Sequence, residues 1–231
     1  MIFHPNHTKI QNIDIFIGKS QLKRVEVIKF LGLLIDPALK WSSHISKIKT
    51  TISKTVGVLY KIKDFVPMYI LKNIYNTLIL PHLNYCNIVW GNAYPTYLNQ
   101  LFLLQKKAVR IITQSDFLAH TRPLFSSLNL LNIFDLHRYH CAVFIFKSIN
   151  NKLPVNFNDY FNFNYDIHNH YTRSSGHLFS LPTNTDTFKR SIVCYGVNFW
   201  NSLTHALRNI KYLNSFSFKL KNHLLSKYRL P

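Results

Sequence analysis

Apolar residues recur every three or four positions after Ser42, which is the spacing of one face of an α-helix. The pattern predicts a helix of about 20 residues, with Ser42 or Ser43 as its cap. Further helices are predicted from Pro67 to Pro81, two prolines that can start and stop a helix, and from Tyr97 to Thr113. The apolar face of the first helix consists of Ile45, Ile48, Ile52, Val56, Leu59 and Ile62.

The residues before this helical part favour β-structure. Segments 13–17 and 25–35 are rich in β-branched and apolar residues, and residues 18–20, Gly-Lys-Ser, are suited to a turn between them. Gly32 lies inside the second segment, where a glycine allows another backbone to approach or marks a bulge. We therefore expect a mainly α fold that begins with a short β-hairpin.

The C-terminal half mixes helical and irregular segments. A helix is predicted near Leu136 to Ser148, and a helical region from Gly196 to Lys227. Residues between these two are rich in Asn, Phe, Tyr, Thr and His without periodicity, which indicates loops or an extended arm. The expected organisation is a sheet edge over residues 1–40, a helical bundle over 41–115, and a helical region over 116–231 with an irregular arm at about 155–190.

The composition indicates a folded and strongly basic protein. Of the 231 residues, 47% are hydrophobic, which is enough for a sizeable core. Lys and Arg total 28 against 9 Asp and Glu, so the formal charge is +19. Such an excess favours a polyanionic partner, most often nucleic acid, because basic side chains on phosphates release counterions.

Nothing in the chain resembles a membrane span or a targeting segment. No stretch approaches about 20 uninterrupted apolar residues, and the N-terminus lacks the basic-then-apolar form of a signal peptide. Three cysteines, Cys86, Cys141 and Cys194, are far apart in sequence. Reduced thiols and an intracellular location are therefore expected.

Basic residues form two rows on the predicted helices. Lys47, Lys54 and Lys61 are seven residues apart, so they should lie along one side of a helix at intervals of about 10.5 Å, with Lys49 and Lys63 beside them. On the third helix, the basic residues are Lys106, Lys107 and Arg110. Such rows can follow a phosphate backbone without reading bases, whereas a single surface lysine more often only contacts solvent.

Candidate catalytic and metal-binding residues are few. The nine acidic residues are scattered and include no Asp-Asp pair, and no Gly-x-Ser-x-Gly nucleophile motif occurs. His137, His140 and Cys141 could share a helix face for zinc, but no fourth ligand at finger spacing is evident. His168, His170 and His177 in the arm also lack a nearby cysteine. We predict no catalytic residue and no metal site.

Several short motifs together resemble a known family. They are Phe30-Leu31-Gly32, residues 85–91 (Tyr-Cys-Asn-Ile-Val-Trp-Gly), residues 103–112 (Leu-Leu-Gln-Lys-Lys-Ala-Val-Arg-Ile-Ile), residues 120–125 (His-Thr-Arg-Pro-Leu-Phe) and residues 199–203 (Phe-Trp-Asn-Ser-Leu). Their order and spacing are similar to the C-terminal part of the reverse transcriptase of jockey-like non-long-terminal-repeat retrotransposons. The resemblance implies that Phe30, Leu31 and Gly32 belong to the primer grip and that the following bundle is the thumb.

The resemblance also implies what the chain lacks. Polymerases of this family use Mg²⁺ ions held by paired carboxylates that include an Asp-Asp dipeptide, which is absent here, so the chain is expected to begin after the catalytic strand. We expect a truncated fragment that holds RNA–DNA or DNA primer–template without catalysis and binds no cofactor. Implied partners are the missing polymerase palm or another element-encoded protein, and the implied location is the nucleus. The alternatives are a helical protein-interaction module that uses an exposed arm over residues 154–182, and a transposon remnant without function.

Overall fold

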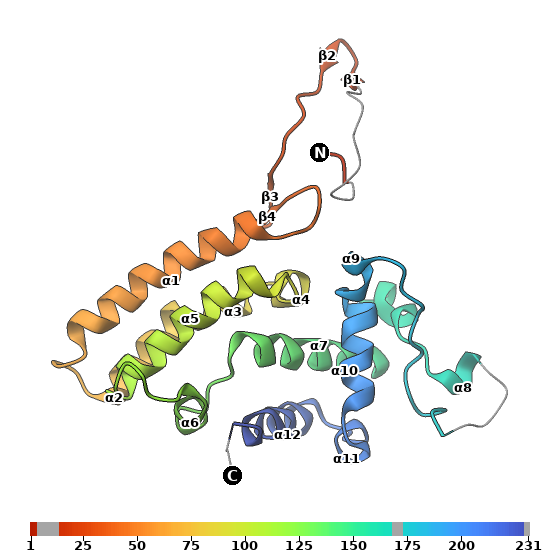
Figure 1. Ribbon diagram of the computed structural model, residues 1–231. Helices are drawn as coiled ribbons and strands as arrows, with labels where there is room; N and C mark the ends of the chain where they lie inside the picture. Colours follow the sequence, from red (N-terminus) through yellow and green to blue (C-terminus); the bar gives the residue numbers. More distant parts are fainter. Residues whose placement is uncertain (4–13, 168–172, 229–231) are drawn as a thin grey trace.

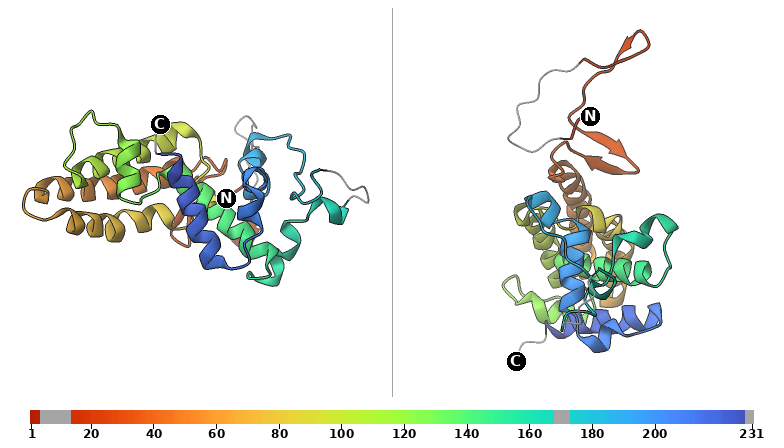
Figure 2. Two further views of the ribbon diagram at one scale, coloured as in Figure 1. Left: turned by 90° about the horizontal axis from the view of Figure 1, so that it is seen from below. Right: turned by 90° about the vertical axis from the view of Figure 1, so that its right-hand side faces the viewer.

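The computed structural model describes residues 1–3, 14–167 and 173–228, and the architecture is mainly helical (Figure 1). Two small β-hairpins precede the helices, and the first of them extends away from the helices (Figure 2). The helices share one hydrophobic core that runs from Leu33 to Tyr228. The predicted fold class, mainly α with an N-terminal hairpin, is confirmed, whereas the predicted division at residues 40 and 115 stays a prediction.

The N-terminal strands are arranged differently from the prediction. β1 (Phe16–Ile17) pairs with β2 (Ser20–Gln21), and β3 (Ile28–Phe30) pairs with β4 (Leu33–Ile35), both antiparallel. The prediction of one hairpin that joins segments 13–17 and 25–35 was therefore wrong. Each segment lies in a hairpin of its own, because two-residue turns at Gly18-Lys19 and at Leu31-Gly32 reverse the chain within a few residues.

Helix α1 (Ser42–Ile62) is the long helix that the apolar period predicted, and five of the six predicted apolar positions are buried. Its start differs from the prediction, since neither Ser42 nor Ser43 caps it and the N-cap residue is Trp41 at φ 65°. The Asp36 carboxylate accepts hydrogen bonds from the backbone N–H groups of Lys40 and Trp41 at 2.9 and 2.7 Å. A carboxylate from the preceding loop therefore holds the turn that leads into α1.

Three further helices connect α1 to its main packing partner. α2 (Met68–Leu78) follows Pro67, α3 (Leu80–Asn84) contains Pro81 in its first turn, and α4 (Asn87–Trp90) precedes α5 (Pro95–Ile112). α1 and α5 run side by side with their C-terminal ends together (Figure 1). This pair is the framework on which the basic residues are placed.

The sharp junction around α4 explains much of the motif at residues 85–91. Trp90 is fully buried and donates from its indole nitrogen to the Tyr85 carbonyl oxygen at 2.8 Å. The Asn87 side-chain amide donates to the Leu83 carbonyl oxygen at 2.9 Å. A Cβ on Gly91 would lie only 2.5 Å from the Asn87 carbonyl oxygen and 2.6 Å from Nδ1 of His137. The motif is therefore a packed corner of the fold that requires a residue without a side chain at position 91.

The C-terminal half contains one central helix and many short elements. α7 (Ile133–Ile149) is packed against α5, α10 and α12. The helical region predicted from Gly196 to Lys227 is present as several separate helices. The remaining elements are α6 (Thr121–Ser127), the 3-10 helix η1 (Val155–Tyr160), α8 (Asn164–Ile167), α9 (Asp186–Lys189), the π-helical turn η2 (Ile192–Gly196), α10 (Val197–Ser202), α11 (His205–Arg208) and α12 (Leu213–Ser226).

One buried glutamine joins the two halves. The side chain of Gln105 on α5 donates to the Tyr75 hydroxyl at 2.8 Å and accepts from the backbone N–H of Ile133 at 2.8 Å. Gln105 and Tyr75 are both fully buried, and α7 begins at Ile133. α2, α5 and the start of α7 therefore meet at a satisfied polar contact inside an apolar core, which fixes their relative positions.

Candidate nucleic-acid interface

The lysine row on α1 is present on the surface. Lys47, Lys54 and Lys61 are all exposed, and the helical repeat places them opposite the buried stripe. Within the described ranges, none of the three forms an ion pair with an acidic residue. The row therefore offers three unpaired positive charges to solvent along about 21 Å of helix.

The basic residues of α5 are less free than the row on α1. Nζ of Lys106 lies 4.5 Å from the centre of the Phe102 ring. Arg110 donates from Nε and from Nη2 to the Ala119 carbonyl oxygen at 3.0 and 2.9 Å, and it lies near the Phe117 ring. Arg110 thus holds the loop after α5, and only Lys107 of the three is an exposed side chain.

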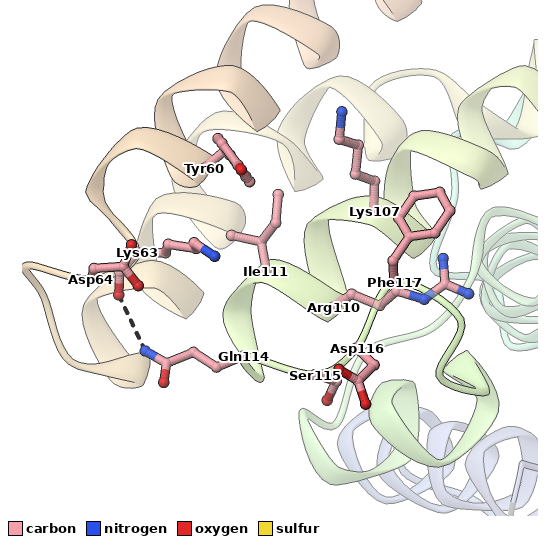
Figure 3. A pocket seen from close by; sticks show the side chains of 10 residues that line it. All are labelled: Tyr60, Lys63, Asp64, Lys107, Arg110, Ile111, Gln114, Ser115, Asp116 and Phe117. Atoms are coloured by element: carbon pink, nitrogen blue, oxygen red, sulfur yellow. Dashed lines mark hydrogen bonds between the residues drawn. The ribbon is translucent and has the colours of Figure 1, made fainter.

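A groove of about 470 Å³ lies where the C-terminal ends of α1 and α5 meet (Figure 3). Lys63, Lys107 and Arg110 line it together with Asp64 and Asp116. The Gln114 side chain donates to the Lys63 carbonyl oxygen at 3.2 Å and ties the two helix ends together.

The structure therefore brings together Lys63, Lys107 and Arg110. Of these three, Lys63 was named in the sequence analysis only as a residue beside the lysine row. It does not bring Lys47, Lys54 and Lys61 to this groove, because they lie on the opposite side of α1 from the core that α5 contacts. The basic residues form two separate surfaces: the α1 row (Lys47, Lys54, Lys61) and the α1–α5 groove. The groove's acidic residues partly offset its charge, so the α1 row is the stronger candidate for phosphate contact.

The Phe-Leu-Gly segment forms the turn of the second hairpin. Leu31 and Gly32 have φ values of 44° and 84°, so both lie in the left-handed region that a tight two-residue hairpin turn requires. Gly32 is thus needed for backbone conformation and is not inside a strand as predicted. Phe30 and Leu31 are exposed at the tip, and Leu31 adopts a conformation that is unfavourable for a residue with a branched side chain.

One residue that sequence reasoning missed holds this turn. The Tyr85 hydroxyl donates to the Leu31 carbonyl oxygen at 2.6 Å, and its ring lies 3.5 Å from the Cβ position of Gly32. Tyr85 is 54 residues away from Leu31, so no local pattern could reveal the contact. The only signal in the sequence was that Leu31 and Tyr85 each belong to one of the motifs that resemble jockey-like reverse transcriptases.

The histidine and cysteine cluster on α7 has structural partners. Nδ1 of His137 lies 3.2 Å from two oxygens of Asn87, so it is the protonated nitrogen, and Nε2 lies 3.4 Å from Sγ of Cys141. Nε2 of His140 lies 3.0 Å from Oδ1 of Asn84. Burial lowers the pKa of His137 and of His140 to about 4 and raises the pKa of Cys141 to about 12. His137 and Cys141 are buried and His140 is half-buried, so these neutral, hydrogen-bonded side chains have a structural role.

The described residues present no cluster of three or more His, Cys, Asp or Glu side chains placed to hold a metal ion. His168 and His170 lie outside those residues. Asp36 is used at the start of α1, and Asp135 accepts hydrogen bonds from Arg138 and Tyr228. The described carboxylates therefore do not fit the paired Mg²⁺ ligands that the resemblance implies for the family polymerase.

The described part of the chain contains no helix that is long and apolar enough to cross a membrane. Cys86, Cys141 and Cys194 are free thiols, as predicted. The fold and its surfaces thus define a helical, strongly basic protein with an exposed lysine row and a projecting hairpin.

Comparisons with known proteins agree with the sequence motifs. The chain is 26% identical over 131 residues to the probable RNA-directed DNA polymerase from transposon X-element of Drosophila melanogaster, and 28% identical over 123 residues to the RNA-directed DNA polymerase from mobile element jockey of Drosophila funebris. The jockey polymerase of Drosophila melanogaster is 26% identical over 117 residues. No protein-family profile matches the chain. No solved structure matches it.

These matches cover 49 to 55% of this chain but only 13 to 14% of each relative. About half of the chain is therefore a region related to jockey-like non-long-terminal-repeat retrotransposon reverse transcriptases. The resemblance that the motifs indicated is confirmed for that region.

Proposed function

We propose that this chain is a reverse-transcriptase-derived module that holds RNA–DNA or DNA primer–template through phosphate contacts and does not polymerise alone. The observation that carries the proposal is the α1 row, three exposed lysines on one helix side with no acidic partner in the described ranges, in a chain of net charge +19. Side chains spaced in this way contact phosphates and carry no base specificity. The similarity to RNA-directed DNA polymerases makes nucleic acid the polyanion to test first.

The hairpin tip is the second part of the proposed interface. Phe30, Leu31 and Gly32 would approach the primer strand, with Tyr85 holding the turn in place. Lys107 and, through its remaining donors, Arg110 would add phosphate contacts at the α1–α5 groove, and Lys106 would support them. A polymerase palm or another element-encoded protein is the proposed protein partner, and the nucleus is the proposed location.

We also propose that this chain does not catalyse polymerisation by itself. The sequence contains no Asp-Asp dipeptide, and the described carboxylates are dispersed. Extension of a primer by two-metal chemistry needs convergent carboxylates. We therefore expect binding of primer–template without incorporation of nucleotides, and no cofactor held by this chain.

The test is the affinity of the chain for a fluorescent RNA–DNA primer–template, measured by anisotropy at several salt concentrations. The variant Lys47→Gln, Lys54→Gln, Lys61→Gln should bind more weakly and should reduce the slope of log K against log salt by up to about 3. The matched control is Lys211→Gln, Lys219→Gln, Lys227→Gln, which removes the same charge from exposed positions near α12.

Equal losses in the two triple variants would show that only net charge matters and would refute the α1 row as the interface. Primer extension by the chain alone would refute the non-catalytic part of the proposal.

The second candidate function is a protein-interaction module. It is favoured by the exposed Tyr160 and Tyr165 in the arm, and such a module would bind a protein with little dependence on salt.

A further inference from the structure

A second cavity lies far along the chain from the lysine row. It has a volume of about 490 Å³ and is lined by residues of the arm and of α10 and α11. Four of its lining side chains are basic or imidazole groups, namely Arg173, His177, His205 and Arg208. No aspartate or glutamate lines it in the described part of the chain. A pocket with this lining is suited to an anion.

Arg208 is held in place and still has an unused donor. Its Nη1 donates to the Gly176 carbonyl oxygen at 3.1 Å, which fixes the guanidinium against the arm. Its Nε is buried and has no hydrogen-bond partner in the described structure. An unpartnered buried donor is costly, and a ligand oxygen that accepts its hydrogen bond would remove that cost.

Aromatic rings line the same cavity. The rings of Phe163 and Tyr165 are stacked, with centres 5.0 Å apart and planes 9° from parallel. Tyr165 is 55% exposed, so much of its ring is open to solvent, while Trp200 is buried at the wall of the cavity. A pair of stacked rings beside cationic groups is a combination that binds a nucleobase together with its phosphate.

The arm is anchored well enough to form such a site. The Asn201 side chain accepts from the Leu178 backbone N–H and donates to the Leu178 carbonyl oxygen, both at 2.9 Å. Leu178 is buried and forms an antiparallel bridge with Phe163. Asn201 on α10 therefore holds the segment that carries Phe163 beside Arg208.

We propose that this cavity binds one phosphate-bearing nucleotide, with the phosphate at Arg208 and Arg173 and the base stacked on Tyr165. The volume is within the usual range for a small-molecule site. The nucleotide is either a free mononucleotide or one residue of a single strand, which share this chemistry. The inference does not rest on the proposed primer–template function, because none of its residues lies on α1, α5 or the hairpins.

The experiment uses the full chain and two probes. One probe is AMP, whose binding is measured by titration calorimetry. The other is a 5′-phosphorylated tetrathymidylate with a 3′ fluorophore, whose binding is measured by fluorescence anisotropy. Arg208→Gln and Tyr165→Ala should each weaken binding about tenfold. Tyr165→Ala removes an exposed ring, so it keeps the test valid if Arg208→Gln does not fold. AMP binding as tight as that of the tetramer would identify a free mononucleotide, and binding of the tetramer alone would identify a strand.

Matched controls separate this site from general charge. Arg122→Gln and Tyr212→Ala change exposed residues outside the cavity and should leave binding unchanged. The triple glutamine variant of Lys47, Lys54 and Lys61 should also bind the probes normally, even if primer–template binding is lost. The proposal is overturned if neither probe binds, or if the cavity variants bind as the unchanged chain does, or if the exposed controls weaken binding equally.

Discussion

The hydroxyl of Tyr85 donates a 2.6 Å hydrogen bond to the carbonyl oxygen of Leu31, across 54 residues of sequence. Leu31 and Gly32 form the left-handed turn at the hairpin tip, and the Tyr85 ring packs beside Gly32. A turn that places a leucine at φ 44° is strained, and strained backbone persists where surrounding contacts determine it. Tyr85 is that contact, and it links the proposed primer-grip tip to the packed corner around Trp90.

Replacing Tyr85 with Phe removes this hydrogen bond and keeps the ring. We expect the free energy of unfolding to change little, because the contact is solvent-exposed. The amides of residues 28–35 should nevertheless exchange faster with solvent deuterium, as measured by mass spectrometry. Tyr69→Phe, at another exposed tyrosine, is the control. Unchanged exchange in Y85F would show that Tyr85 does not hold the hairpin.

Two glycines should respond oppositely to the same substitution. Gly91→Ala places a Cβ 2.5 Å from the Asn87 carbonyl oxygen, so the corner must shift and stability should fall by more than about 2 kcal/mol. Gly57→Ala lies within α1 with no atom within 4 Å, and should stabilise the protein by about 0.5–1 kcal/mol. Urea unfolding of both variants tests the pair, and a stable G91A protein would contradict the tight corner.

Gln105 is the polar link between α2, α5 and α7. Gln105→Leu leaves the Tyr75 hydroxyl and the Ile133 N–H without this partner inside the core, and should cost about 2–4 kcal/mol. Adding Tyr75→Phe removes one of the unpaired groups, so the double variant should recover part of the loss. Gln100→Leu, on the same helix, is the control for helix propensity. Additive losses from the two substitutions would contradict direct coupling between Gln105 and Tyr75.

Stability should fall as the solution is acidified below neutral pH. Burial lowers the pKa of His137 from 6.5 to about 4, against an opposing effect of its hydrogen bond to Asn87, and Arg138 and His140 lower it further. Between pH 6.5 and 4 the unfolded chain binds a proton at this residue that the folded chain does not bind. The free energy of unfolding therefore decreases as the pH is lowered, by up to about 3 kcal/mol for this residue. Burial lowers the pKa of His44 to about 4 as well, so it acts in the same direction.

Urea unfolding at pH 7, 5.5 and 4.5 measures this dependence. His137→Gln should flatten the decline even if the variant is less stable at pH 7, because the titrating group is gone. The exposed His82→Gln should show the decline of the unchanged chain. A variant at position 137 that keeps the full decline would assign the pH dependence to other groups.

The sequence by itself determined the helices, the charge and the relationship to reverse transcriptases. Spacing of apolar residues is a local property, so α1, α2, α5 and α7 were found close to their true bounds. The row of Lys47, Lys54 and Lys61 followed from the same geometry, since positions seven apart on any straight helix share one side. The motif around Trp90 was visible as a resemblance, although its packing role was not.

Only the folded structure decided which groups meet in the loops and turns. Asp36 rather than Ser42 supports the start of α1, because hydrogen bonding there depends on how the preceding loop folds back. Arg110, expected at the surface, is used by the Ala119 carbonyl oxygen of a loop that periodicity does not describe. Strand pairing also depended on turn conformation, and so one expected hairpin proved to be two. Each of these outcomes involves a loop or turn that no apolar period describes, and the conformation of such segments is selected by the packing of the whole chain as well as by local preference.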